Sequence, residues 1–290
     1  MAEDGHASCS AAAAPGAAKP FGLAFALTFA VFLAETVGGL LTHSLALYAD
    51  AAHMAVDLAA LALGAFAAWA AARPPDARRT FGYRRVEVLA ALANGVGLWL
   101  VVGFLLREAV ERLRRPGPVH AGGMLAVALA GLCLNLCSAA VLSRGPKGNI
   151  NLRGVLLHVL SDALGSLGVI AAALVIWRTG WTTADPAATF FVCAVILVAT
   201  WGLVREAVHI LLEGTPPHLD LDGVREALSG VEGVVEVHDL HLWSLSAGSE
   251  SLSCHLVAAN GADPHEVRRA AAKVLAERFS LTHVTLQIED

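Results

Sequence analysis

Charge is the scarcest property of this sequence. Charged residues make up 16% of its 290 positions and hydrophobic residues 56%, whereas soluble globular chains carry roughly 25% charge. The mean hydropathy is +0.62. This deficit excludes a disordered chain, a nucleic-acid-binding protein and an ordinary cytosolic enzyme. It indicates a membrane protein with a soluble part.

Cysteine pairs are also missing. The five cysteines are scattered and form no CxxC pair, which excludes a disulfide framework. Residues 1–19 are rich in Ala, Gly and Ser and lack the basic start and apolar run of a signal peptide. We expect a short disordered tail there, in which His6 and Cys9 are more typical of surface residues than of a metal site.

The charge that is present is divided unevenly along the chain. Residues 1–214 hold 15 Lys and Arg against 13 Asp and Glu, whereas residues 215–290 hold 5 against 12. Six of the 12 histidines also fall in the second stretch. The sequence therefore predicts an apolar body of residues 20–213 and an acidic, histidine-bearing domain of residues 214–290.

Six long apolar segments make up the body. They lie at roughly 21–42, 45–72, 86–106, 120–143, 154–178 and 187–211. Each is close to or above the roughly 20 residues that a helix needs to cross a bilayer, and only a helix satisfies its own backbone there. The runs are continuous rather than alternating, which disfavours a barrel. Basic residues in loops 73–85 and 144–153 favour both termini on the cytoplasmic side.

The acidic domain predicts a small α+β fold. Residues 222–229 and 263–279 have helical patterns, and Asp263-Pro264 is a typical helix start. Residues 234–242, 251–258 and 283–289 alternate like strands. The order α-β-β-α-β predicts a small α+β sandwich with one antiparallel sheet.

Ionisable residues inside the apolar segments are the strongest functional signal. His53 and Asp57 in the second segment, and His158 and Asp162 in the fifth, repeat the pattern His-x-x-x-Asp. Residues four apart share one face of a helix, so each pair can reach one cation. Two nitrogen and two oxygen ligands match a tetrahedral zinc shell. A buried His–Asp ion pair within each helix is the structural alternative.

Two further acidic residues accompany these pairs. Asp50 lies on the face of His53, where it is either an outer ligand or entry residue or a helix-end cap. Glu35 in the first segment is a charge without an obvious partner in the sequence. A buried charge is costly in a membrane unless it is paired or faces water.

Four stretches closely resemble the cation diffusion facilitator family. They are 44–57 (SLALYADAAHMAVD), 80–87 (TFGYRRVE), 157–166 (LHVLSDALGS) and 237–245 (VHDLHLWSL). The resemblance covers about residues 21–290. It implies six membrane helices, a cytoplasmic domain with a metallochaperone-like (ferredoxin-like) fold, a homodimer and metal–proton antiport. The His and Asp set is similar to that of the zinc-preferring branch, so Zn²⁺ is the implied substrate and regulator, with Cd²⁺ or Co²⁺ as alternatives.

The resemblance also implies two ligand sets. The transport site is implied at His53, Asp57, His158 and Asp162. The cytoplasmic site is implied at His238, His255, His265 and Glu289. The resemblance implies one further ligand position, which holds Gln287 instead of His, and this leaves open whether one or two metals bind. His283 and His241 lie nearby in the sequence. The strand pattern places His241 on the opposite face from His238.

Two features of the basic loop complete the comparison with the family. Some members bind metal after the second helix, but Arg79 and Tyr83 stand here where those members have His, so we expect Asp76 not to serve a metal site. Arg85 and Glu213 match a charge pair of relatives near the dimer and domain junction. The alternative for Arg85 is a solvated side chain in a basic loop.

The resulting hypothesis is a zinc exporter that exchanges Zn²⁺ for protons across an inner or plasma membrane, without enzymatic activity. Metal binding requires neutral His and ionised Asp and therefore displaces protons. An intramembrane metalloenzyme is a rival, although catalytic zinc usually keeps an open position and three protein ligands. A passive channel and a metal sensor are the other rivals.

Overall fold

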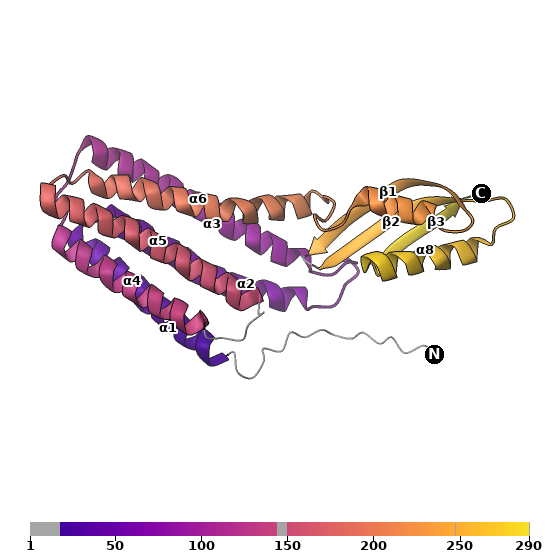
Figure 1. The fold of residues 1–290 in the computed structure, drawn as a ribbon, viewed down its shortest axis with the longest axis horizontal. Helices are drawn as coiled ribbons and strands as arrows, with labels where there is room; N and C mark the ends of the chain where they lie inside the picture. The colour runs from indigo at the N-terminus through magenta and orange to yellow at the C-terminus, as the bar shows by residue number, and fades with distance from the viewer. Residues whose placement is uncertain (1–17, 144–149, 247, 290) are drawn as a thin grey trace. The chain divides into compact units, whose positions relative to one another are not determined.

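The computed structural model describes residues 18–143, 150–246 and 248–289. His6 and Cys9 therefore lie outside the described residues. The chain divides into two compact units, one formed by residues 1–58 and 98–199 and the other by residues 59–97 and 200–290. Figure 1 shows the course of the chain through its elements.

Six long helices come first along the chain (Figure 1). They are α1 (Ala18–Thr42), α2 (Leu45–Ala71), α3 (Arg85–Arg114), α4 (Ala121–Ser143), α5 (Ile150–Thr179) and α6 (Ala184–Leu211). Among the described residues, α2 to α6 each contain a stretch long and apolar enough to cross a membrane, and the described apolar part of α1, Ala26–Thr42, is shorter. The prediction of six apolar helices is confirmed, with α3 extending to Arg114.

Small residues bring the helices of the first unit together. Helix α4 packs against both α1 and α5. A Cβ atom added at Gly38 in α1 would lie 2.6 Å from Val127 in α4, and one added at Gly168 in α5 would lie 2.8 Å from Phe191 in α6. Glycine therefore permits these close approaches, as is common between membrane helices.

Asp185 fixes the start of α2. Its side chain is fully buried and accepts hydrogen bonds from Ser44 Oγ and from the backbone N–H groups of Leu45 and Ala46, at 2.5, 2.8 and 3.2 Å. The Arg112 guanidinium lies 3.7 Å away. The first N–H groups of a helix have no partner within the helix, so this carboxylate from α6 satisfies two of them. The cap of α2 is thus Asp185, and Asp50 lies inside the helix.

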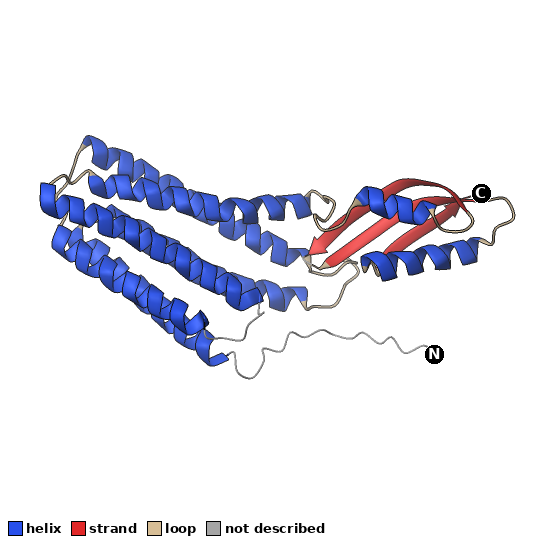
Figure 2. Cartoon of the chain, viewed as in Figure 1, coloured by secondary structure: helices blue, strands red, loops and turns tan. Residues whose placement is uncertain are grey.

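The second unit contains an α+β fold (Figure 2). Its elements are α7 (Leu221–Ser229), β1 (Val234–Ser246), β2 (Ser249–Ala258), α8 (Pro264–Phe279) and β3 (His283–Glu289). Asp263 caps α8 by accepting from the His265 N–H, and Pro264 occupies its first turn. The predicted order and the predicted helix start are confirmed.

The expectation of a wholly antiparallel sheet was wrong. The sheet has the order β1-β2-β3; β1 and β2 are antiparallel, but β2 and β3 are parallel. Only two residues separate β1 from β2, whereas α8 connects β2 to β3. Because a helix returns the chain to the end at which β2 began, the next strand runs in the same direction.

The core of this fold lies on one face of the sheet. Leu252, Cys254 and Leu256 of β2 are buried and pack with Leu228 of α7 and Leu275 of α8. Alternate residues of a strand point to opposite faces. His255, which lies between Cys254 and Leu256, therefore points away from both helices.

Candidate metal sites

Three of the four predicted transport ligands lie close together, because two aspartates approach the same nitrogen of His53. His53 Nε2 lies 3.3 Å from Asp57 Oδ2, one turn along α2, and 3.7 Å from Asp162 Oδ1 in α5. Their side chains are 13%, 24% and 2% exposed. The helical spacing that suggested the pair thus places His53 and Asp57 on one face, and α5 brings Asp162 to the same point.

Each of the two distances from His53 suits a pair of ligands on one tetrahedral ion. Ligands about 2.0–2.2 Å from a tetrahedral zinc ion lie roughly 3.3–3.6 Å from one another. The two separations from His53 Nε2 are close to that range, whereas the donor atoms of all three side chains do not lie within 4.8 Å of one another. His158 lies one turn before Asp162 in α5, but its side chain is outside the described residues.

Glu35 and Asp50 form a second acidic pair within this unit. Both residues are buried, with 1% and 2% of their surface exposed. Glycines accommodate the pair: a Cβ atom at Gly131 would lie 2.7 Å from Glu35 Oε1, and one at Gly165 would lie 3.4 Å from Asp50 Oδ1.

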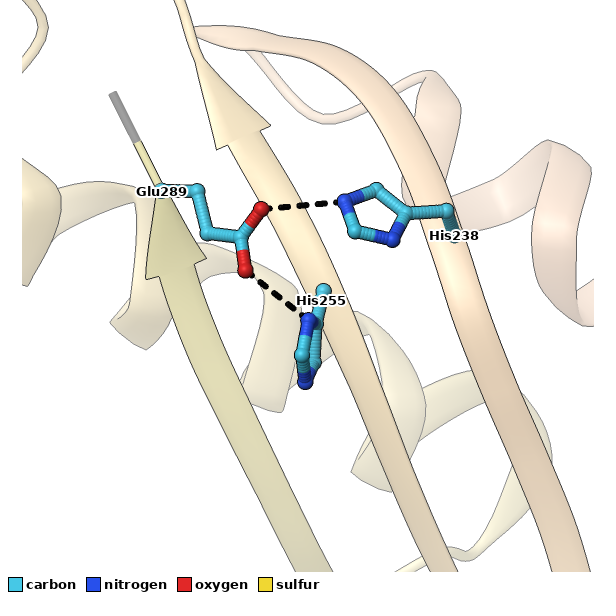
Figure 3. Close-up of side chains that lie close together, drawn as sticks. All are labelled: His238, His255 and Glu289. Atoms are coloured by element: carbon cyan, nitrogen blue, oxygen red, sulfur yellow. Dashed lines mark hydrogen bonds and ion pairs between the residues drawn. The ribbon is translucent and has the colours of Figure 1, made fainter.

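The second group of candidate ligands lies on the helix-free face of the sheet in the other unit (Figure 3). His238 of β1 is the register partner of His255 in β2, and their ring centroids are 5.2 Å apart. Glu289 of β3 lies between them, with Oε2 3.0 Å from His238 Nε2 and Oε1 2.8 Å from His255 Nδ1.

These three side chains can bind one metal ion. Among the described residues, they form the group of at least three His, Cys, Asp or Glu side chains whose donor atoms all lie within 4.8 Å of one another. Two imidazole nitrogens and a carboxylate oxygen are a donor set that suits zinc. Cys254 is on the opposite face, where burial raises the pKa of its thiol to about 11, so a neighbouring thiolate is not part of the set.

Gln287 supports this group without joining it. Its Nε2 donates to Glu289 Oε1 at 2.8 Å. Desolvation raises the pKa of Glu289, but the hydrogen bonds from Gln287 and His238 and the nearby His255 outweigh it, so the pKa lies below its usual value. The carboxylate is therefore ionised and available as a ligand.

The other predicted histidines lie outside the group. His265 is exposed at the start of α8, and His283 is exposed and packs edge-on against Phe81 at 5.7 Å. His241 is exposed on the same side of β1 as His238, not on the opposite face as expected. A bulge between His238 and His241, with Asp239 at a φ of 48°, adds a residue and shifts the alternation.

Sequence reasoning missed Asp239. Its Oδ1 lies 2.9 Å from His241 Nε2, and its Oδ2 lies 3.6 Å from His255 Nε2. The carboxylate thus contacts the ring nitrogen of His255 that faces away from Glu289, the position from which acidic partners orient metal-binding histidines. The signal in the sequence was its place directly after His238.

The basic loop after α2 has its own contacts. Asp76 accepts hydrogen bonds from the Tyr83 hydroxyl at 2.7 Å and from the Arg78 and Arg79 N–H groups. These hydrogen bonds lower the pKa of Asp76, and the bond from Tyr83 has the largest effect. Arg85 Nη2 and Glu213 Oε1 are 2.8 Å apart, so Arg85 forms the expected ion pair.

Comparison with known proteins adds an independent observation. Residues 22–212 match the family model described as the cation efflux transmembrane domain, and residues 216–290 match that of the cation efflux protein cytoplasmic domain. The chain is 43% identical to the cation efflux system protein CzcD of an Alcaligenes strain, over 92% of this chain and 85% of that protein. It is 38% identical to the cadmium, cobalt and zinc/H(+)-K(+) antiporter of Bacillus subtilis, over 92% and 87%. It is also 38% identical to the zinc transporter ZitB of Escherichia coli, over 92% and 85%.

Proposed function

Because this chain belongs to the cation efflux family, a family of metal transporters, we propose that it exports Zn²⁺ from the cytoplasm in exchange for protons. The observation that carries the proposal is the approach of Asp57 and Asp162 to His53 Nε2 at 3.3 and 3.7 Å. We propose His158 as the fourth ligand, because it stands one turn from Asp162 as His53 stands one turn from Asp57.

Zinc is the substrate that this ligand set favours. Two imidazoles and two carboxylates complete a tetrahedral shell, whereas Mg²⁺ and Ca²⁺ prefer six or more oxygen ligands. The names of similar proteins include zinc, cadmium and cobalt, and these ions accept similar nitrogen and oxygen donors. Cd²⁺ and Co²⁺ are therefore the alternative substrates.

Proton exchange follows from the chemistry of the ligands. A histidine must be neutral and an aspartate ionised before either binds a metal, so loading the site displaces protons. Histidine is the proton carrier best suited to neutral pH, because its ordinary pKa is about 6.5. An outward-facing site would then release zinc as protons compete for its ligands.

The rest of the chain fits a regulated, dimeric transporter. We assign residues 20–213 to transport and residues 214–290 to a cytoplasmic metal-binding and dimerisation domain, with both termini in the cytoplasm. His238, His255 and Glu289 would hold the regulatory zinc. His265 is the fourth proposed cytoplasmic ligand, although its side chain lies outside this group. Light scattering of the purified protein tests the proposed homodimer.

Transport in sealed liposomes tests the main proposal. A zinc dye inside the vesicles reports flux under an imposed pH gradient, for the wild type and for Asp162→Asn. Glu108→Gln is the matched control, since Glu108 pairs with Arg112 at 3.4 Å in the same unit and is not a proposed ligand. We expect gradient-driven flux in the wild type and the control and none in Asp162→Asn.

The other outcomes separate the rival functions. Zinc flux that is the same with and without the pH gradient would indicate a channel. Zinc binding without flux in the wild type would indicate a sensor or an enzyme. Flux in Asp162→Asn equal to that of the wild type would exclude the His53–Asp57–Asp162 group as the transport site.

A further inference from the structure

A cavity that neither metal site uses lies within the second unit. Its volume is about 840 Å³, within the range of roughly 300–1,000 Å³ that is typical of small-molecule sites. Its walls come from the loop after α2, the start of α3, the segment after α6, and β1 with its neighbours. Its charged side chains are Arg78, Arg79, Arg84, Arg85 and Glu213.

Two of the four arginines are neutralised by acidic partners. Arg85 pairs with Glu213 at 2.8 Å. Arg79 lies 3.8 Å from Asp76 and donates to the Tyr83 hydroxyl at 3.2 Å. The charges of these two guanidinium groups are thus balanced by carboxylates of the same unit.

The other two arginines keep an unbalanced positive charge. Arg84 Nη1 donates to Ser249 Oγ, a neutral hydroxyl. The Arg78 guanidinium is exposed and makes no hydrogen bond or ion pair with any residue that the structure describes. Two guanidinium groups of one cavity, each with donors to spare, favour an anion that can accept several hydrogen bonds.

The apolar part of the lining indicates that the anion is attached to something larger. Phe81, Leu240 and Trp243 line the same cavity. A free inorganic anion is small and would leave the apolar side chains of the lining without a contact. A phosphate ester with an apolar body fills both parts of the cavity.

The position of the cavity in the chain points to lipid. Arg85 is the first residue of α3, and Arg78 follows the end of α2 at Ala71 by seven residues, which span at most about 25 Å. Both helices are apolar enough to cross a membrane. Near the end of α2, the Arg73 guanidinium lies 3.9 Å from the centre of the Trp69 ring, and tryptophan and arginine are frequent at the membrane surface.

We propose that this cavity binds the phosphate of an anionic phospholipid headgroup through Arg78 and Arg84. Basic pockets beside membrane helices attract such headgroups. The site is separate from both metal groups, because none of the eight proposed metal ligands lines it. Its test is therefore independent of zinc transport.

Native mass spectrometry of the delipidated full-length protein tests the site. Phosphatidylglycerol and phosphatidylcholine are titrated against the wild type and the double variant Arg78→Gln/Arg84→Gln. The control is Arg268→Gln/Arg278→Gln, which removes two exposed arginines of α8 outside the cavity. We expect tighter binding of phosphatidylglycerol than of phosphatidylcholine, and an apparent Kd at least 10-fold weaker in the cavity variant than in the control.

Further variants and control measurements identify the source of the phosphate and show whether each variant is folded. Arg78→Lys/Arg84→Lys keeps the charge and should restore part of the binding. Elution volume and zinc binding at His238, His255 and Glu289 should match the wild type in every variant. Equal lipid binding by cavity variant and control would overturn the proposal. If inorganic phosphate binds in an arginine-dependent way and lipid does not bind, the proposal of a phospholipid ligand would be wrong. The site would then bind a soluble phosphate.

Discussion

Gln287 donates a hydrogen bond from Nε2 to Oε1 of Glu289, at 2.8 Å. Gln287 is also the register partner of His255 in the parallel pair of strands, and His255 is in turn the register partner of His238. Gln287 thus completes a row of three residues across the sheet. It positions the carboxylate that contacts both histidines.

Substitution of Gln287 tests this relationship. Gln287→Ala removes the donor that orients Glu289, and we expect zinc affinity to fall roughly 10-fold, the lower end of the range for lost orienting partners. Gln287→His places a third imidazole in the row and should raise the affinity or the number of ions bound. Calorimetry of full-length Asp162→Ala protein, with the transport site disabled, measures both. Identical isotherms for the three proteins would show that Gln287 has no part in the site.

Zinc binding by the same group should depend on pH through its histidines. The pKa of Glu289 is lowered. Its carboxylate therefore stays ionised at and above the usual pKa of glutamate, and it is protonated only as the pH falls through the lowered value. A histidine must be neutral to bind a metal, so protons compete with zinc at the two imidazoles of the group as the pH falls.

The slope of log affinity against pH measures this competition. We expect a limiting slope near two for the Asp162→Ala protein and near one after the additional substitution His255→Ala, with affinity at least roughly 10-fold weaker. His283→Ala is the matched control, because His283 packs against Phe81 outside the group. A slope that His255→Ala leaves unchanged would remove His255 from the ligand set.

Gly131 should be intolerant of even one added methyl group. A Cβ atom there would lie 2.7 Å from Glu35 Oε1 and 3.5 Å from Val31, so alanine must displace the buried carboxyl of Glu35. We expect Gly131→Ala to destabilise the protein by about 1–3 kcal/mol, as overpacking does, and to slow transport. Gly103→Ala in α3 is the control, because a Cβ atom at Gly103 meets nothing within 4 Å. Thermal unfolding and liposome flux compare the two; equal melting temperatures would contradict the expected clash.

The features that the sequence predicted well are those set by local periodicity. Uninterrupted apolar runs predicted the six helices, because a membrane helix must satisfy its own backbone. Spacing of four predicted that His53 and Asp57 share a face. Alternation predicted β2 and β3, and Asp263 with Pro264 predicted the start of α8.

The features that the sequence did not predict depend on partners far away along the chain. The bulge at Asp239 results from how β1 pairs with β2, and it moved His241 to the side of His238. The parallel pairing of β3 depends on the route of α8. The three hydrogen bonds of Asp185 reach residues about 140 positions earlier, and no local pattern marks that carboxylate as a helix cap.

Asp185 provides the last prediction, because it ties the start of α2 to α6. Asp185→Ala leaves the N–H groups of Leu45 and Ala46 without their acceptor and Arg112 without a buried counter-charge. We expect stability to fall by at least about 1–2 kcal/mol, the cost of losing a strong cap, and transport to fall because His53 lies on the same helix. Asp185→Asn, which keeps one acceptor oxygen but not the charge, should lie between alanine and the wild type.

An exposed cap provides the comparison for Asp185. Asp220 accepts from the Asp222 N–H at 3.2 Å at the start of α7, so Asp220→Ala removes a cap of the same chemistry from a solvated helix. Its N–H groups can turn to water, and we expect a smaller loss of stability and unchanged zinc flux. Melting temperature in detergent and flux in liposomes are measured for all three variants. If Asp185→Ala behaves like Asp220→Ala in both assays, the buried network does not hold α2 in place, and the position of His53 must depend on its packing with α5 instead.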